Sequence, residues 1–318
     1  MIDRRPGVII QANSEQEVVR AVRFAAEHEI LLALRSGGHS IAGKSSCNDG
    51  MLIDLRNINH VEVNVEQQTA KIGPGATLAD IDAATQQHGL LVPTGINSTT
   101  GIAGLTLGGG FGWASGRFGL TIDNLIAVQL VSASGERVTA SVDENPDLFW
   151  ALRGGGGNFG VVTEFEFRLH QLDPEIYTGL IVFPLEQAQH VLATRSKLMA
   201  NAPDDVSCWA VLRKAAPLPF IAEDWHGQSV IILAACFLGP VEAGKAAIQK
   251  LAGIGSPIGQ MLSPMSFTDW QAIFDPFAEP GMRNYWKSQD LAELEENAAE
   301  LLVHAAFSSS SAKSWLFQ

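Results

Sequence analysis

The sequence predicts an α+β fold divided into two domains. Short strands alternate with helices in the first third of the chain, and longer strands and helices follow beyond Pro174. The length of 318 residues fits about two domains of roughly 150 residues each. Hydrophobic residues make up 46% of the chain and charged residues 17%, so each domain can bury a large core. We expect one domain over 1–173 and a second over 174–318.

Charge and cysteine content exclude several classes of function. The formal net charge of −13 argues against a nucleic-acid or anionic-membrane partner, because either partner requires a basic surface. The cysteines Cys47, Cys208 and Cys236 form neither a disulfide framework nor a zinc motif, so we expect no metal. No apolar run reaches the ~18 residues of a membrane span, and no signal peptide opens the chain. We therefore expect a soluble, cytoplasmic, acidic protein.

The first sixty residues predict a small parallel β-α-β sheet. Strands are expected at 8–10, 31–34 and 51–55. Between the first two, Ser14 and Glu17 have the Ser-x-x-Glu spacing of a capping box at a helix start.

From about His60 the pattern predicts a second group of strands. Alternating residues indicate strands at 61–65, 70–72, 126–131, 137–140 and 161–169, with helices at 77–88 and 147–152. Thr77 and Asp80 are placed to cap the first of these helices. In the last strand Phe165 and Phe167 share one face while Glu164 and Glu166 take the other, so one side is buried.

Beyond Pro174 the pattern predicts longer strands packed with helices. The expected strands are 179–183, 207–212 and 230–238, and the expected helices are 185–200, 241–251 and 290–306. The serines after residue 307 are expected to form a frayed end.

The segment 38–45 matches the G-x-x-x-x-G-K-S pattern of a nucleoside-triphosphate loop. That loop binds phosphate only when a helix starts at its Lys-Ser pair, because the helix amides hold the anion. Here the turn-forming residues 46–50 lead directly into a strand and leave no room for a helix. A P-loop nucleotide-binding function is therefore a poor explanation of this segment. An ordinary connection between two strands, without any ligand, is a second explanation.

Glycine is concentrated in two further clusters. Of the 31 glycines, nine fall between Gly95 and Gly119 and five between Gly154 and Gly160. A dinucleotide fingerprint fits poorly, because it would need glycine at Ser115. The stretch 93–112 contains no Lys or Arg, so its free backbone N–H groups would have to recognise an anion such as a pyrophosphate. For one glycine cluster alone, tight packing between sheets is the alternative to ligand binding. Together with the loop at 38–45 there are three such loops, which favours an elongated, phosphate-bearing ligand.

These segments resemble the FAD-linked oxidases of the vanillyl-alcohol oxidase and berberine-bridge-enzyme-like family. Residues 35–40 (Arg-Ser-Gly-Gly-His-Ser) resemble the R-S/G-G-G-H-S/N loop of that family, and 93–112, 119–124 and 147–163 match its other motifs. The resemblance covers nearly everything from Met1 to about Leu172. It implies a PCMH-type FAD-binding fold of two subdomains, followed by an incomplete substrate domain made of an antiparallel sheet and helices.

The resemblance also implies which residues contact FAD. His39 would be the covalent attachment site on the 8α carbon of the flavin, and Gly37 and Gly38 would cradle the pyrophosphate. For Asp123 and Asn124, a purely structural turn is an equal alternative. The full set of implied cofactor-binding residues is Arg35, Ser36, Gly37, Gly38, His39, Ser40, Thr94, Gly95, Asn97, Ser98, Thr100, Gly101, Gly104, Leu105, Gly108, Gly109, Gly110, Asp123, Asn124, Gly160, Val161 and Val162.

Two departures from the family pattern bear on the chemistry. Members with two covalent flavin bonds place a cysteine where this chain has Asn97, so at most one covalent bond is expected here. The position that resembles an oxygen gate, often valine, is Thr100. The acceptor that reoxidises the flavin is therefore either oxygen or another molecule.

The implied reaction is oxidation of a CH–OH or similar carbon of a small organic substrate by hydride transfer to covalently bound flavin. No catalytic base is assigned. Tyr285, within 283–288, resembles part of a recurrent substrate-domain stretch, but packing is the favoured explanation for it. The substrate domain is expected to be truncated at its C-terminus, so a flavin-binding remnant without a complete active site is the alternative function.

Overall fold

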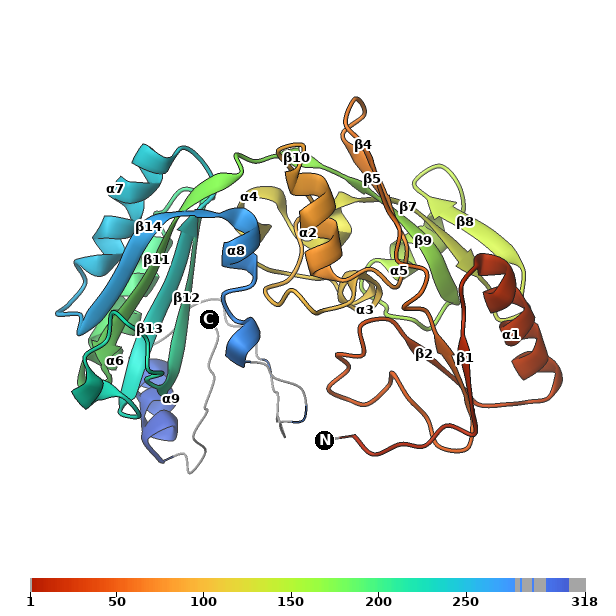
Figure 1. Ribbon diagram of the computed structural model, residues 1–318, viewed down its shortest axis with the longest axis horizontal. Helices are drawn as coiled ribbons and strands as arrows, with labels where there is room; N and C mark the ends of the chain where they lie inside the picture. Colours follow the sequence, from red (N-terminus) through yellow and green to blue (C-terminus); the bar gives the residue numbers. More distant parts are fainter. Residues whose placement is uncertain (1, 278–280, 282–287, 289–295, 309–318) are drawn as a thin grey trace. The chain divides into compact units, whose positions relative to one another are not determined.

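The computed structural model describes residues 2–277, 281, 288 and 296–308, and the chain divides into two compact units (Figure 1). Unit 1 comprises Met1–Leu172 with Gln271–Lys287, and unit 2 comprises Asp173–Trp270 with Ser288–Gln318. The chain returns to unit 1 at Gln271, and a single boundary at residue 173 does not include this return.

Unit 1 begins with the small parallel sheet that the sequence predicts. Its strands are β1 (Val8–Gln11), β3 (Met51–Asp54) and β2 (Leu32–Arg35), in that order, and both pairings are parallel. Helix α1 (Glu15–Glu27) buries its apolar side, including Val18 and Val22, against Ile53 of β3. The capping box is only half formed: the Ser14 hydroxyl accepts from Glu17 N, but the Glu17 carboxylate accepts from Asn13 N at 2.8 Å.

The second sheet of unit 1 is antiparallel and has five strands. In order across the sheet they are β4 (Val61–Asn64), β5 (Thr69–Ile72), β9 (Val161–Arg168), β7 (Leu125–Val131) and β8 (Arg137–Ser141). A short pair, β6 (Leu90–Leu91) and β10 (His170–Gln171), lies outside it. The expected alternation on β9 is confirmed, since Phe165 and Phe167 are fully buried while Glu164 and Glu166 are half-buried.

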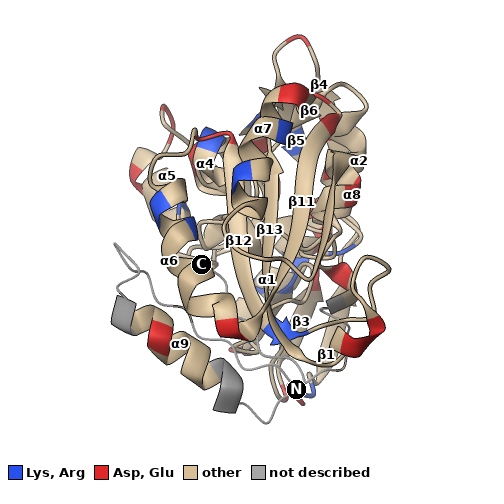
Figure 2. Ribbon diagram, turned by 90° about the vertical axis from the view of Figure 1, so that its left-hand side faces the viewer, with Lys and Arg blue, Asp and Glu red and all other residues tan. Residues whose placement is uncertain are grey.

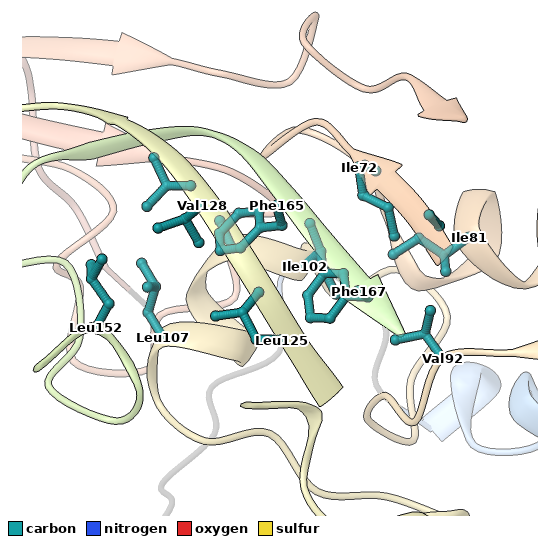
Figure 3. Packing of buried hydrophobic residues seen from close by; sticks show 14 of the residues in the cluster. Ile72, Ile81, Val92, Ile102, Leu107, Leu125, Val128, Leu152, Phe165 and Phe167 are labelled. Atoms are coloured by element: carbon teal, nitrogen blue, oxygen red, sulfur yellow. The ribbon is translucent and has the colours of Figure 1, made fainter. Parts of the chain in front are cut away.

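Helices cover one face of this sheet and enclose the main core of unit 1 (Figure 3). The helical elements of the unit are α2 (Leu78–Gln86), α3 (Ile102–Leu107), α4 (Ser115–Phe118), α5 (Pro146–Leu152) and the 3₁₀ turns η1 (Thr121–Asn124) and η4 (Asp275–Phe277). Phe165 and Phe167 pack with Ile81 of α2, Ile102 of α3 and Leu152 of α5. The core therefore fixes the starts and ends of the loops that connect these elements.

Helix α2 begins with the capping box that the sequence predicts. Thr77 N donates to the Asp80 carboxylate at 2.8 Å, and Asp80 N donates to the Thr77 hydroxyl at 3.3 Å. Two of the unpaired N–H groups at a helix start are satisfied in this way.

Unit 2 is an antiparallel sheet of four strands with helices on one face (Figure 1). In order the strands are β12 (Val206–Lys214), β13 (Ser229–Phe237), β11 (Glu175–Pro184) and β14 (Gly259–Ser266). Its helices are α6 (Ala188–Met199), α7 (Val241–Ala252) and α9 (Glu296–Ser308), with 3₁₀ turns η2 (Leu185–Gln187) and η3 (Glu223–Trp225). Helix α8 (Phe267–Gln271) ends where the chain returns to unit 1.

One face of the four-stranded sheet forms the core of unit 2. Ile181 of β11 and Leu233 of β13 pack against Leu192 of α6 and Ile248 of α7. The central parts of β11, β12 and β13 carry no charged residues, and the coloured residues of Figure 2 lie mostly on helices, loops and strand ends. Nearly every residue of β11 and β13 is buried, on both faces of the sheet, and strands buried on both faces have continuous apolar sequences.

Two features of unit 2 differ from the sequence-based expectation. Strand β14 was not predicted, because the stretch 259–266 contains Pro264 and little β-branched character. Among the described strands β14 pairs with β11 alone, and this edge position explains why proline is tolerated there. Residues 290–295 of the expected last helix, and Tyr285, lie outside the described residues.

Within the described part of the chain, no helix has both the length and the apolar character that a membrane span requires.

The core of unit 1 gives a direct stability test. We expect Phe165→Ala to lower the free energy of unfolding by about 3–5 kcal/mol, because a fully buried ring is lost and the surrounding sheet and helices cannot close the cavity. Chemical denaturation monitored by far-UV circular dichroism measures the change.

The matched control is Glu166→Ala, one residue along on the opposite side of β9. A loss below about 0.5 kcal/mol is expected for that change. Equal losses for the two variants would contradict the burial pattern.

Candidate functional site

Four loops of unit 1 carry the residues expected to form a binding site. We call them loop A (35–40, after β2), loop B (93–112, which includes α3), loop C (119–124, which includes η1) and loop D (154–160, between α5 and β9). Their positions in the sequence do not require them to meet, because loop A and loop D are more than 110 residues apart. The structure brings all four together.

Loop A is fixed at its start by a charged cluster on the neighbouring strand. The Arg35 guanidinium lies 3.1 Å from the buried carboxylate of Asp54, which Arg56 also contacts at 2.6 Å. Burial alone would raise the pKa of Asp54, but the hydrogen bonds from Arg56 and the charges of both arginines outweigh it and hold that pKa below its ordinary value. Arg35 is therefore a structural anchor for loop A.

Loops A and B touch through two glycines. A Cβ on Gly37 would collide with the backbone N of Gly101, and a Cβ on Gly101 would collide with the backbone N of Gly37 and the Ser36 hydroxyl. Ser36 is itself fixed, since its hydroxyl donates to Pro74 O at 2.6 Å. Only glycine allows this approach of backbone to backbone.

Loop B turns its carbonyl groups toward the start of α2. Leu78 N donates to Thr100 O at 3.0 Å, and Ala79 N donates to Ser98 O at 2.9 Å. In the same region Ile102 N donates to Ala76 O at 3.0 Å. The helix start thus obtains acceptors that its own turn cannot supply.

Residues from the return segment also hold loop B. Gln271 Nε2 donates to the Thr94 hydroxyl at 2.9 Å and to Gly95 O at 2.8 Å. The Asp275 carboxylate accepts from Ser98 N at 2.9 Å and from the Ser98 hydroxyl. No pattern in the sequence indicated either contact, because 271–277 contains no motif and the partners are 177 residues away.

Loops C and D meet loop B near the end of α3. Ile122 N donates to Gly109 O at 3.1 Å, Thr121 N donates to Gly110 O at 2.9 Å, and Gly156 N donates to Leu107 O at 2.9 Å. The four loops are therefore connected to one another through loop B.

Several residues of loops B and C serve the fold through their side chains. Leu105 packs into the core beside Gly95 and Gly110. The Asp123 carboxylate accepts from Leu120 N and lies 3.3 Å from Arg153, which also donates to Ile122 O. These contacts are those of a structural turn.

Asn124 is committed in the same way, through a partner that sequence reasoning missed. Its amide nitrogen donates to Phe118 O and Leu120 O, and its amide oxygen accepts from His170 Nε2 at 2.5 Å. Burial, with smaller contributions from Arg168 and Arg117, lowers the pKa of His170, which favours the neutral ring. No motif pointed to His170, because its role comes from contact with a loop 46 residues away.

Loop D feeds directly into β9. A Cβ on Gly160 would lie within 3 Å of both Val131 O and Leu130 Cδ1, so this position also requires glycine. Val161 and Val162 pair with β7, whereas β5 pairs with β9 only from Phe165 onward. Along 161–164, the edge of β9 away from β7 therefore has no partner among the described strands, and its backbone groups are available.

The surface offers the donors and the open space that an elongated, phosphate-bearing cofactor requires. None of the backbone N–H groups of 37–40 donates to another described residue. A Cβ built on Gly104, Gly109, Gly154 or Gly157 meets no described atom within 4 Å. Free amides beside glycine backbone form an anion-binding nest, and the open positions let a flat ligand lie against the chain.

The His39 side chain reaches from loop A to loop B, where it makes one polar contact with a described residue. Its Nε2 lies 3.1 Å from the Thr99 hydroxyl, and that hydroxyl donates to the Asn97 amide oxygen at 2.6 Å. Asn97 Oδ1 also accepts from Thr99 N, so it is the acceptor of this pair. The single hydroxyl proton of Thr99 goes to Asn97, and Thr99 can therefore only accept from His39.

This hydrogen-bond chain places the proton of neutral His39 on Nε2 and leaves a lone pair on Nδ1. Partial burial lowers the pKa of His39, although Thr99 and the Asp275 carboxylate act in the opposite direction. The neutral ring is thus favoured, and its free nitrogen is nucleophilic.

The phosphate-loop match at 38–45 lacks the helix that its chemistry needs. Residues 41–50 form turns and bends that lead into β3, and Gly43 N and Lys44 N both donate to Ser40. Without a helix start at Lys44, the arrangement does not hold a triphosphate.

A family model described as an FAD binding domain matches residues 6–141. An FAD-linked oxidoreductase of Dictyostelium discoideum is 32% identical over 303 residues, which cover 94% of this chain and 63% of that relative. The chain thus spans less than two thirds of the length of this curated relative.

Solved structures agree with this match. The crystal structure of 6-hydroxy-D-nicotine oxidase from Arthrobacter nicotinovorans superposes with a TM-score of 0.87 at 27% identity, covering 97% of this chain and 67% of that one. A berberine-bridge-enzyme-like protein of Physcomitrella patens shares the fold, with a TM-score of 0.80 at 23% identity over 95% of this chain and 67% of its own. FAD is therefore the cofactor that the free amides and open glycines of unit 1 fit.

Two glycine substitutions separate packing from cofactor binding. Gly104→Ala adds a methyl group in open space on α3, so the flavin-free protein should be as stable as wild type or slightly more stable, by up to about 1 kcal/mol. If FAD lies against this glycine, the flavin bound per protein falls. Thermal unfolding of the flavin-free protein and the visible spectrum of the purified protein measure the two effects.

Gly37→Ala is the contrasting variant, because its methyl group must push loops A and B apart. Both stability and flavin content should fall. Full flavin content in Gly104→Ala would show that the cofactor does not lie against α3.

Proposed function

We propose that this chain, a member of the vanillyl-alcohol oxidase and berberine-bridge-enzyme-like family of FAD-linked oxidoreductases, oxidises a carbon bearing a hydroxyl or amine group in a small organic molecule. FAD, when bound, supplies the hydride acceptor. The observation that carries the proposal is the meeting of loops A, B, C and D beside free backbone amides, with the His39 side chain in contact with loop B.

The loops would hold the cofactor mainly through backbone groups. The N–H groups of 37–40 are the proposed pyrophosphate donors, and the small residues of loop B are the proposed wall along the rest of the molecule. Val161 and Val162 would supply backbone groups on the unpaired edge of β9.

His39 is the proposed covalent attachment residue. The neutral ring, with its lone pair on Nδ1, has the character that a bond to the flavin requires. Asn97, at the position of a second attachment cysteine in the resembled bicovalent members, is occupied by hydrogen bonds to Thr99. One covalent bond is therefore the proposal.

The proposed substrate class follows from the family. The solved structure with a TM-score of 0.87 is named as a 6-hydroxy-D-nicotine oxidase, an enzyme of a small organic molecule. The proposed partners are a small organic substrate and an electron acceptor, either oxygen or another molecule, and the proposed location is the cytoplasm. Thr100 is the residue at the proposed oxygen gate, and its backbone is fixed to Leu78.

Acid precipitation tests the covalent bond. The washed pellet of wild-type protein should keep a flavin absorption spectrum, whereas the pellet of His39→Ala should be colourless because nothing retains the flavin after unfolding. His28→Ala, which removes an exposed histidine at the end of α1, is the control and should retain the colour. A coloured pellet from His39→Ala would assign the attachment to another residue.

Anaerobic reduction tests the activity itself. Purified flavin-loaded protein is mixed with alcohols, sugars and cyclic amines, and the flavin absorbance is followed without oxygen. Bleaching by one of these substrates is the expected result, because hydride transfer reduces the flavin. Tight flavin binding with no bleaching by any member of these classes would favour a flavin-binding protein without a complete active site.

A further inference from the structure

A buried carboxyl group lies in the middle of α2, directly behind loop B. Asp82 is 2% exposed, and its neighbours along the helix, Ile81 and Thr85, are fully buried. Neither carboxyl oxygen accepts a hydrogen bond from a described residue. An unpaired carboxylate in such a place is very costly, so the group needs a specific explanation.

The neighbour of Asp82 is the side-chain amide of Gln271. Gln271 is also buried, and its amide nitrogen donates to the Thr94 hydroxyl and to Gly95 O. Because a carbonyl such as Gly95 O can only accept, the nitrogen of the amide must be the atom that faces loop B. Both hydrogens of that nitrogen are therefore used.

The remaining polar atom of Gln271 is its amide oxygen, which is buried and receives no hydrogen bond from a described residue. An ionised Asp82 has no proton to give to it, and the two groups would face each other with lone pairs. A protonated Asp82 would donate to the oxygen and satisfy both side chains. Burial raises the pKa of Asp82 to about 8, so the acid form prevails at neutral pH.

Among the described residues, no charged side chain shifts the pKa of Asp82. Asp80, also on α2, is exposed and caps the helix, and Glu62 on β4 is exposed. In the α8 and η4 segments, Asp269 accepts from Ser266 and Asp275 accepts from Ser98. Strand β6, which also packs on α2, contains only leucines.

We propose that Asp82 is a positioning residue for the cofactor site: in its protonated form it donates to Gln271, and Gln271 in turn holds Thr94 and Gly95 of loop B. The assignment rests on the proposed function in one respect, that loop B contacts FAD. Its consequence is that ionisation of Asp82 loosens loop B and weakens the hold on flavin as the pH rises.

The sign of the pH dependence follows from the raised pKa. Between the pKa of an exposed aspartate, near 4, and about 8, the folded protein binds more protons at Asp82 than the unfolded protein does. The contribution of Asp82 to stability therefore declines as the pH rises through this window. Asp82→Asn, whose amide N–H can donate at every pH, should be free of this decline.

Hydrogen exchange of the loop B amides tests the positioning directly. After correction for the intrinsic exchange rates, protection of Ser98, Thr99 and Thr100 in flavin-loaded wild type should fall by about tenfold between about pH 6 and about pH 9. Asp82→Asn should keep its protection constant, and the control Glu62→Gln, an exposed acid on β4, should behave as wild type. Gln271→Leu, which removes the link, should show low protection at every pH.

A wild-type protection that does not vary with pH, or an unchanged pH dependence in Asp82→Asn, would overturn the proposal. A second measurement separates it from the proposed function: the rate of FAD release from His39→Ala protein, with and without Asp82→Asn, over the same pH range. If FAD release accelerates with pH only when Asp82 is present, the result supports both the positioning role of Asp82 and the proposed contact of loop B with FAD. Loop protection that depends on Asp82 while flavin release does not would keep the positioning role and reject loop B as a flavin contact.

Discussion

The contact between Gly37 and Gly101 is the constraint on which the binding surface depends. Loop A leaves the small parallel sheet, and Gly101 of loop B directly precedes α3, so these two glycines fix the sheet end against the start of that helix. Backbone can touch backbone there only because neither residue has a Cβ. Glycine also loses more conformational entropy on folding than any other residue. Two contacts that anchor loop A help to offset this cost: the Arg35–Asp54 ion pair and the Ser36–Pro74 hydrogen bond. With the junction fixed, His39 is held within 3.1 Å of Thr99.

The direction of the peptide groups explains how an acidic protein can bind a pyrophosphate. In loop B the start of α2 takes the carbonyls of Ser98 and Thr100, and Thr99 N donates to Asn97 Oδ1, so these groups serve the fold. In loop A the N–H groups of 37–40 remain free for an anion. Backbone dipoles act at short range and carry no net charge, whereas the repulsion from the net charge of −13 is spread over the surface and screened by salt within about 10 Å. At the proposed pyrophosphate site, the local donors of loop A would therefore act without a lysine or arginine in loop B.

Much of the fold could be predicted from the sequence, because it depends on local patterns. Alternation predicted β9 and its buried face, and the Thr77–Asp80 spacing predicted the cap of α2. The need for a helix after a phosphate loop also predicted correctly that the 38–45 segment is not one, because turns follow it instead. Strand β14 was missed, because an edge strand tolerates a proline that local rules count against it.

The binding surface was only partly predictable, for a different reason. The glycine clusters indicated where backbone must be bare, but the groups that hold loop B come from residues far away in the chain. Gln271 and Asp275 belong to a segment without motif or periodicity, and His170 was an unremarked strand residue. Their roles depend on tertiary contacts, for which a single sequence contains no local signal.

The hydrogen-bond capacity of Gln271 gives a physical reason for an acid inside α2. An apolar side chain of similar size at position 82 would avoid the cost of burying a carboxyl group, and for stability of the helix packing alone it would be the better choice. It would, however, leave the amide oxygen of Gln271 buried without a donor, and that penalty would fall on the residue that holds Thr94 and Gly95. A buried lysine or arginine could donate, but it would bring a charge into a site that has no counter-ion among the described residues. A carboxylic acid is compact, neutral at the raised pKa of this position and able to donate one hydrogen bond, so it meets the requirement of Gln271 at the smallest electrostatic cost.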